Sequence, residues 1–305
     1  FPRRRKIRPM NTPHPGLWAV LLVALPLALA LAAYVARRRI QPILVWIAPL
    51  AMAGMVTGLI HSLIHQGPFR YEIGGWTPPL GITWRVDGLA AAMLAITALV
   101  VGAVCVYASG YFAGFSKTAN AGKAELFWPL AYLLWASLNA LFLSADIFNL
   151  YVTLELITLG SVGLIVLAGT AESLAAALRY LMLGLMASLL YLMGVALIYA
   201  SYGSLDMVTL GGQLRGDPLT WTAASLMIVG LLVKTALFPM HFWLPPAHAG
   251  APAPVSALLS ALVVKASFYL TLRLWFDVFP AVARPSAAQF LGVLGACAIL
   301  WGAIH

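Results

Sequence analysis

Charged residues are scarce in this chain. Of its 305 residues, 9% are Asp, Glu, Lys or Arg, whereas 62% are hydrophobic, and the mean hydropathy is +0.94. Soluble globular domains carry about 25% charged residues, so these values exclude that class. The composition indicates a multi-pass membrane protein, with the lipid bilayer as its surroundings.

Cysteine is also rare, and so are the motifs that hold cofactors. The two cysteines, Cys105 and Cys297, lie in apolar runs without the spacing of a metal or redox site. The sequence contains no glycine-rich turn of the kind that binds a dinucleotide and no cysteine cluster for iron–sulfur. We therefore expect neither a cofactor nor a metal in this chain.

The net charge of +9 arises largely at the N-terminus. We take residues 1–16 as a basic tail. Because the chain begins with Phe1 and Met10 stands just before the first apolar run, residues 1–9 are interpreted as upstream sequence rather than a functional tail. No aromatic pattern accompanies the charge, so nucleic acid is not an expected partner. The basic residues of the tail are Arg3, Arg4, Arg5, Lys6 and Arg8.

Nine apolar runs are long enough to be transmembrane helices, for which about 20 residues suffice. We therefore predict an all-α, polytopic transmembrane helix bundle of about nine helices. Residues 66–85 alternate around a Gly-Gly-Trp-Thr-Pro-Pro turn and predict a surface hairpin after the second helix. The last run reaches the chain end, which we interpret as a truncated ninth helix. The runs are 17–36, 40–65, 86–108, 125–144, 146–168, 173–200, 219–238, 253–275 and 287–305.

Deep inside three of these runs lie the ionisable side chains of Glu155 in the fifth, Lys234 in the seventh and Lys265 in the eighth. A charge at mid-bilayer depth is costly and by default indicates an ion or proton path. Pro239 has no N–H for the preceding turn, so the seventh helix is expected to break just after Lys234. Broken backbone at that depth lies in buried protein or beside water. The alternative for Lys234 is a side chain that extends to the interface.

Desolvation predicts that Glu155 and Lys234 form a pair. A lone buried carboxylate takes up a proton and a lone buried ammonium loses one, whereas each keeps the other charged. Two unit charges about 4 Å apart attract by about 4 kcal/mol at an effective dielectric near 20, enough to move a pKa by about 3 units. Separating the pair could therefore unload the lysine. The alternative is a static ion pair that joins two helices.

Two further residues extend this pathway in the prediction. We expect Lys265 to lie farther along the same buried polar line. His241 follows Lys234 by seven residues, which would place it on the same face of an unbroken helix, and its pKa suits a relay between the lysines. A local hydrogen-bonding role for His241 is the alternative.

With these residues identified, the chain resembles the antiporter-like proton-translocating subunits of respiratory complex I, Mrp-type sodium/proton antiporters and membrane-bound hydrogenases. The resemblance covers the chain from about residue 74 to 275. Pro246 departs from the family pattern, which has an aspartate there. The motifs are GGWTPPLGITWRVDG (74–88), DIFNLYVTLEL (146–156) and KTALFPMHFWLPPAHAGAPAPVSALLSALVVKASFYLTLR (234–273).

The resemblance implies a fold of about fourteen helices with two inverted repeats. Residues 17–123 would be the first three helices with the hairpin, and 124–275 the first proton-channel repeat. It also implies that Glu155 pairs with Lys234 and that Lys265 passes the proton on.

The function expected from the resemblance is proton translocation within a complex I-like, NADH:quinone oxidoreductase-type assembly in the cell inner membrane. Other membrane subunits would be partners, and any redox reaction would belong to them. The alternatives are an Mrp-type antiporter subunit, which would also carry Na⁺, and an inert scaffold with static ion pairs.

Overall fold

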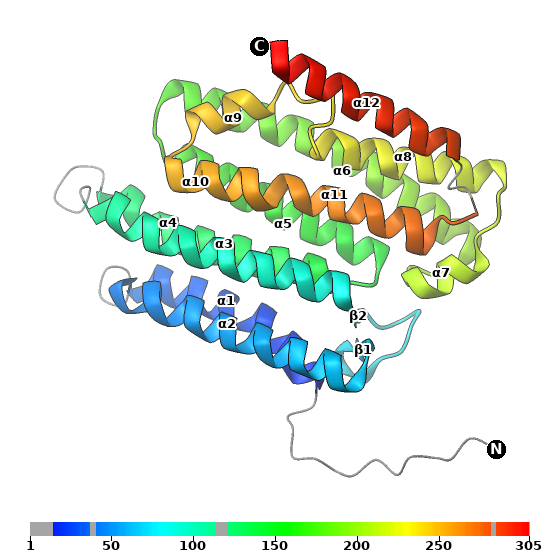
Figure 1. The fold of residues 1–305 in the computed structure, drawn as a ribbon, viewed down its shortest axis with the longest axis horizontal. Coiled ribbons are helices and arrows are strands. Elements are labelled where there is room, and N and C mark those ends of the chain that lie inside the picture. Colours follow the sequence, from blue (N-terminus) through cyan, green and yellow to red (C-terminus); the bar gives the residue numbers. More distant parts are fainter. Residues whose placement is uncertain (1–14, 37–40, 114–120, 282–284, 305) are drawn as a thin grey trace, which may run out of the picture.

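The computed structural model describes residues 15–36, 41–113, 121–281 and 285–304. Its helices run alongside one another in a bundle (Figure 1). Among the described residues, eight helices are long and apolar enough to cross a membrane, and a further apolar helix of 17 residues ends at Lys234. The predicted all-α bundle of about nine spans is confirmed. Most of the predicted basic tail lies outside the described residues.

The first six spans are uninterrupted helices. The sixth is the longest, at 32 residues. Their bounds are α1 (Pro15–Ala36), α2 (Gln41–Gln66), α3 (Gly88–Ala113), α4 (Ala121–Leu143), α5 (Ile147–Val166) and α6 (Ala171–Tyr202).

The last three spans differ in regularity. The seventh is α8 (Pro218–Lys234), followed after an irregular stretch by the short helix α9 (Leu244–Gly250), and the ninth is α12 (Pro285–Ile304). The eighth contains two π-helical turns, closed by i→i+5 bonds from Val264 N to Leu259 O and from Phe279 N to Leu274 O. Its parts are α10 (Ala253–Leu258), η3 (Leu259–Val263), α11 (Val264–Arg273) and η4 (Leu274–Val278).

A two-stranded hairpin covers one end of the bundle. Strands β1 (Phe69–Glu72) and β2 (Thr83–Val86) pair antiparallel, with Phe69 opposite Val86. The short helix α7 (Met207–Gln213) lies at the same end (Figure 1). Arg70 of β1 forms an ion pair with Asp206, whose carboxylate caps α7 by accepting from Thr209 N.

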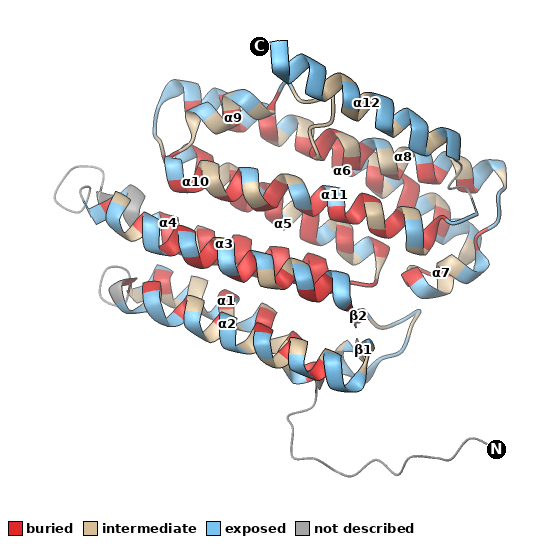
Figure 2. Ribbon diagram, in the orientation of Figure 1, coloured by how far each residue is buried: buried red, intermediate tan, exposed pale blue. Residues whose placement is uncertain are grey.

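The core lies between the inward faces of the central helices (Figure 2). Helix α4 packs against α1, α3 and α5, and its most apolar stretch is the most buried of the candidate spans. The fully buried Tyr132, Trp135 and Phe142 belong to it. Helix α12 is at the other extreme and exposes most of its surface within this chain (Figure 2). Helix α5 packs against α4 and α6, and α8 packs against α6. The ionisable residues of the fifth and seventh spans therefore lie on helices next to the core.

Candidate functional site

Helix α8 ends at Lys234, as predicted for the break in the seventh span. Asp217 caps its start by accepting a hydrogen bond from Thr220 N, and Pro218 occupies the first turn, where a missing N–H costs nothing. Beyond Lys234 the backbone turns, with Ala236 in the left-handed region at a φ of 54°. Non-glycine residues adopt that conformation only when the surroundings enforce it. The predicted break is confirmed.

Glu155 of α5 and Lys234 of α8 meet inside the bundle. The distance from Lys234 Nζ to Glu155 Oε1 is 3.4 Å, and the two side chains are 7% and 16% exposed, respectively. Lys234 is the last residue of its helix, where the backbone carbonyls of the final turn favour a positive charge. The geometry is that of a mostly buried, loosely spaced ion pair whose cation is further stabilised by a helix end.

Each member of the pair also contacts a buried hydroxyl group. Lys234 Nζ donates to Thr158 Oγ1 at 2.8 Å, and Ser188 Oγ of α6 donates to Glu155 Oε1. Neither hydroxyl was singled out from the sequence. Thr158 follows Glu155 by three residues on α5, so helical spacing was a signal that could have found it, whereas no local pattern points to Ser188.

Close packing of α6 on α8 brings these groups together. A Cβ added at Gly230, one turn before Lys234, would lie 2.4 Å from the carbonyl oxygen of Ala187. A Cβ at Gly194 would lie 2.6 Å from the carbonyl oxygen of Ala223. Small residues permit this approach between membrane helices, and Ala187 is the neighbour of Ser188. The glycines therefore position the hydroxyl and the lysine on facing helices.

The structure differs from the expectation for Lys265. Its side chain is exposed within this chain and donates to the carbonyl of Ser260, so the expectation that it lies on a buried line with Lys234 is wrong for the described chain. The π-helical turn η3 precedes it and adds a residue to that turn, which changes the face on which later residues lie. The charge of Lys265 acts on His248, whose Nδ1 lies at hydrogen-bond distance, 2.9 Å, from Ser256 Oγ.

His241 lies in the irregular stretch between α8 and α9. Its ring stacks on Phe238 with centroids 5.6 Å apart. Its Nδ1 is buried and has no hydrogen-bond partner among the described residues. Because Lys234 ends its helix, the seven-residue spacing does not put the two on one helical face. A role for His241 therefore depends on its place beside the break.

A second charged cluster, at the hairpin end, was missed by the sequence analysis. Arg273 of α11 donates to both oxygens of Asp87, with Nη1 to Oδ2 at 2.7 Å, and its Nη1 lies 3.2 Å from Asp277 Oδ2. Arg85 of β2 contacts the same two carboxylates, at 3.0 Å and 2.8 Å. Burial opposes charge on Asp87, but hydrogen bonds from Arg273 and from Ala90 N outweigh it and lower its pKa. We call the four residues Asp87, Arg273, Asp277 and Arg85 the hairpin clamp.

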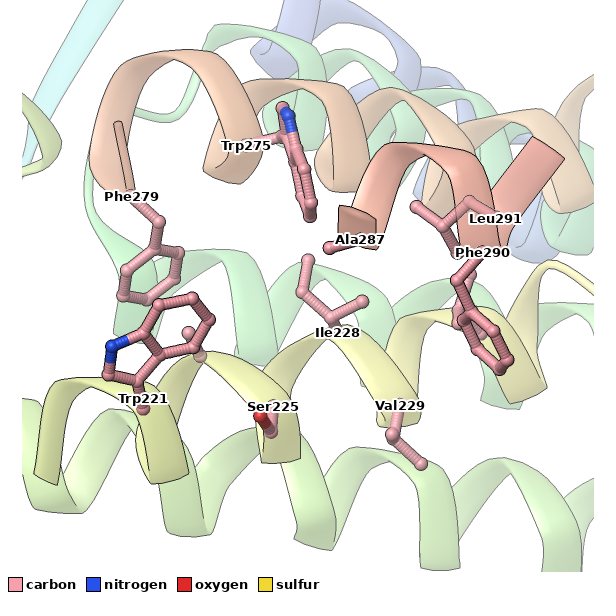
Figure 3. A pocket seen from close by; sticks show the side chains of 11 residues that line it. Trp221, Ser225, Ile228, Val229, Trp275, Phe279, Ala287, Phe290 and Leu291 are labelled. Atoms are coloured by element: carbon pink, nitrogen blue, oxygen red, sulfur yellow. The ribbon is translucent and has the colours of Figure 1, made fainter. Parts of the chain in front are cut away.

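An apolar cavity of about 210 Å³ lies on another face of α8. Figure 3 shows Trp221, Ile228 and Val229 of α8 facing Trp275 and Phe290 across it. Lys234 and Glu155 do not line it. The cavity is therefore separate from the charged pair.

Comparison with known proteins gives matches over nearly the whole chain. The family model described as "NADH:quinone oxidoreductase/Mrp antiporter, TM" matches residues 144–305. NADH-quinone oxidoreductase subunit N of Desulforudis audaxviator is 37% identical over 293 residues, which are 93% of this chain and 58% of that protein. A Na(+)/H(+) antiporter subunit of Alkalihalophilus pseudofirmus is 33% identical over 265 residues, 82% of this chain and 52% of that one.

A solved structure gives a similar result. A chain of the membrane-bound sulfane sulfur reductase, an archaeal respiratory membrane complex, matches with a TM-score of 0.81 at 29% identity, over 89% of this chain and 56% of that chain. This chain thus spans a little over half the length of the proteins it matches. The matched region includes Glu155, Lys234, His241 and Lys265.

Proposed function

Because this chain belongs to the NADH:quinone oxidoreductase/Mrp antiporter family of membrane subunits, we propose that it translocates protons through the buried pair of Glu155 and Lys234. The observation that carries the proposal is the 3.4 Å contact between Lys234 Nζ and Glu155 Oε1 at the end of a broken helix. Such a pair is stable when both members are charged and becomes costly when one is removed. Its opening and closing can therefore control the proton on Lys234.

The proposed cycle starts with the closed pair. When Glu155 turns away, Lys234 is left in a buried site and its proton is released. His241, whose buried Nδ1 has no partner among the described residues, lies beside the break and is the proposed intermediate. Lys265 is the proposed acceptor. Because Lys265 is exposed in this chain, it could transfer the proton to a group on a neighbouring polypeptide.

The proposed setting is a multi-subunit complex in the cell inner membrane. A complex I-like assembly is the first candidate, supported by the 37% identity to the NADH-quinone oxidoreductase subunit over 93% of the chain. An Mrp-type antiporter, with Na⁺ as the exchanged ion, is the second candidate because the match to the Na(+)/H(+) antiporter relative covers 82% of the chain. Dependence of proton flux on external Na⁺, measured in vesicles, separates the two.

Lys234→Arg tests the proposal in vesicles that contain the intact complex. A guanidinium keeps the ion pair but does not release its proton, so proton flux should fall to the level of Lys234→Ala. The matched control is Arg179→Lys at an exposed position of α6, which should leave flux unchanged. Wild-type flux with Lys234→Arg would make Lys234 a structural cation and would favour the scaffold alternative.

A further inference from the structure

Two buried hydroxyl groups are hydrogen-bonded to the two ions of the pair. Thr158 is 2% exposed and Ser188 is 1% exposed. The contact from Lys234 Nζ to Thr158 Oγ1, at 2.8 Å, is shorter than the 3.4 Å separation of the two ions. Glu155 in turn accepts from Ser188 Oγ. Each charged group therefore has a neutral hydrogen-bond partner in addition to the opposite charge, and for Lys234 the neutral partner is the nearer of the two.

The orientation of the Thr158 hydroxyl suits a cation. Its Oγ1 donates to the carbonyl of Leu154 at 2.9 Å, which leaves a lone pair for the ammonium of Lys234. Its methyl group packs toward α6, where a Cβ added at Gly184 would lie 3.0 Å from Thr158 Cγ2. The side chain is thus held in the rotamer that points its oxygen at Lys234.

We propose that Thr158 and Ser188 are positioning residues that stabilise the charged forms of Lys234 and Glu155 in the closed pair and so set the pH limits between which the pair forms. The proposal rests on the proposed function of that pair. A buried ion without any partner is costly. Because Ser188 lies on α6 and already donates to the oxygen of Glu155 that faces Lys234, its bond can hold the carboxylate when the pair separates. Lys234, once neutral, keeps Thr158 as its hydrogen-bond acceptor.

The two hydroxyls should affect opposite limbs of a pH profile. Thr158 accepts from the ammonium, so its loss disfavours protonated Lys234 and moves the alkaline limb to lower pH. Ser188 donates to the carboxylate, so its loss disfavours ionised Glu155 and moves the acidic limb to higher pH. Hydrogen bonds to charged groups are strong enough for shifts of about one pH unit or more.

Among the described residues, few other ionisable groups lie close to the pair of Glu155 and Lys234. In the part of the chain that the structure describes, the charge that acts on Lys234 is that of Glu155, and Glu155 also interacts with the phenol of Tyr180 on α6. The remaining carboxyl, amino, guanidinium and imidazole groups on the elements around the pair lie at helix ends, beside the break or on exposed faces. In the described chain they include Glu125, Asp146, Glu172, Arg179, Asp217, His241, His248 and Lys265.

The experiment compares Thr158→Val, Thr158→Ser and Ser188→Ala with wild type in vesicles that contain the intact complex. Proton flux is measured across the pH range, and the thermal midpoint of each purified complex is recorded. Valine keeps the shape of threonine without its hydroxyl, whereas serine keeps the hydroxyl without the methyl. We expect a downward shift of the alkaline limb in Thr158→Val, recovery in Thr158→Ser, and an upward shift of the acidic limb in Ser188→Ala.

Lys234→Ala in the same vesicles separates the two levels of the proposal. If Lys234→Ala abolishes flux and Thr158→Val keeps the wild-type pH limits, the role of the hydroxyls is refuted and the pair mechanism stands. If Lys234→Ala retains flux, the proposed function itself fails. A lower maximal flux with unmoved limbs and a lower thermal midpoint would reduce Thr158 to a packing residue, which also overturns the inference.

Discussion

Two features of the position of Lys234 stabilise its ammonium form against the effect of burial. It ends α8, where the last carbonyls carry partial negative charge, and it lies 3.4 Å from a carboxylate. It is also nearly enclosed, with 7% of its side chain exposed. The contact to Glu155 is therefore the interaction whose loss matters most for its charge, because the helix end cannot move away from it.

Glu155→Gln should lower proton flux at neutral pH at least about tenfold in the intact complex. The amide keeps the volume and the hydrogen bond from Ser188 but removes the negative charge that holds the proton on Lys234. The measurement is flux into vesicles, with complex yield on a native gel as the assembly control. Glu172→Gln, which changes an exposed carboxylate of the same type, is the matched variant and should pump normally. Full flux in Glu155→Gln would contradict the pair mechanism.

Among the elements, α6 and α8 pack closely through small residues. Their backbones come so close that a Cβ at Gly230 would lie 2.4 Å from Ala187 O, inside any allowed contact. The neighbouring atom belongs to the backbone of another helix, so relief requires one helix to move. The spacing between these two helices sets where Lys234 lies relative to Ser188 and Glu155.

Gly230→Ala should therefore destabilise the fold by about 2 kcal/mol or more, as overpacking does elsewhere, and should reduce proton flux in parallel. Gly54→Ala in α2 is the matched control, because nothing lies within 4 Å of a Cβ at that position. Thermal unfolding in detergent measures the first effect and vesicle assays the second. An unchanged thermal midpoint in Gly230→Ala would mean that the α6–α8 contact is less tight than the structure has it.

Across the whole molecule, the hairpin clamp joins segments that are far apart in the sequence. Arg273 and Asp87 are 186 positions apart, yet they share two hydrogen bonds, and Arg85 and Asp277 extend the cluster to β2 and η4. Arg273 Nε also donates to Tyr269 Oη, which in turn donates to the carbonyl of Phe142. The clamp thus links the hairpin, α3, α4 and the interrupted eighth span at one end of the bundle.

Asp87→Asn should lower the stability of the purified chain by about 2–3 kcal/mol at neutral pH, because Arg273 loses its charged partner. The pKa of Asp87 is lowered from its ordinary value of 3.8, so its contribution is complete above that pH and is lost as the pH falls below it. Thermal midpoints of wild type and variant should therefore differ less at an acidic pH of about 3 than at neutral pH. An equal gap at both would argue against the clamp.

Local features of the sequence determined the spans and the break. Each apolar run that is long enough to cross a bilayer became a helix, because backbone groups in lipid must bond within their own segment. Pro239 has no backbone N–H to donate to the carbonyl four residues before it, so the break after Lys234 follows from the covalent structure of proline. The proximity of Glu155 and Lys234 was also predictable, since neither charge is stable alone. What they do in a transport cycle remains a prediction.

The tertiary structure decided which groups complete the site. Thr158 and Ser188 are ordinary hydroxyl residues in sequence and become partners of the ions through the crossing of α5, α6 and α8. The exposure of Lys265 follows a π-helical turn that no residue pattern announces. The clamp unites Asp87 with Arg273 across most of the chain. Such contacts depend on how helices rotate and pack against each other, which is set by the whole bundle rather than by neighbouring residues.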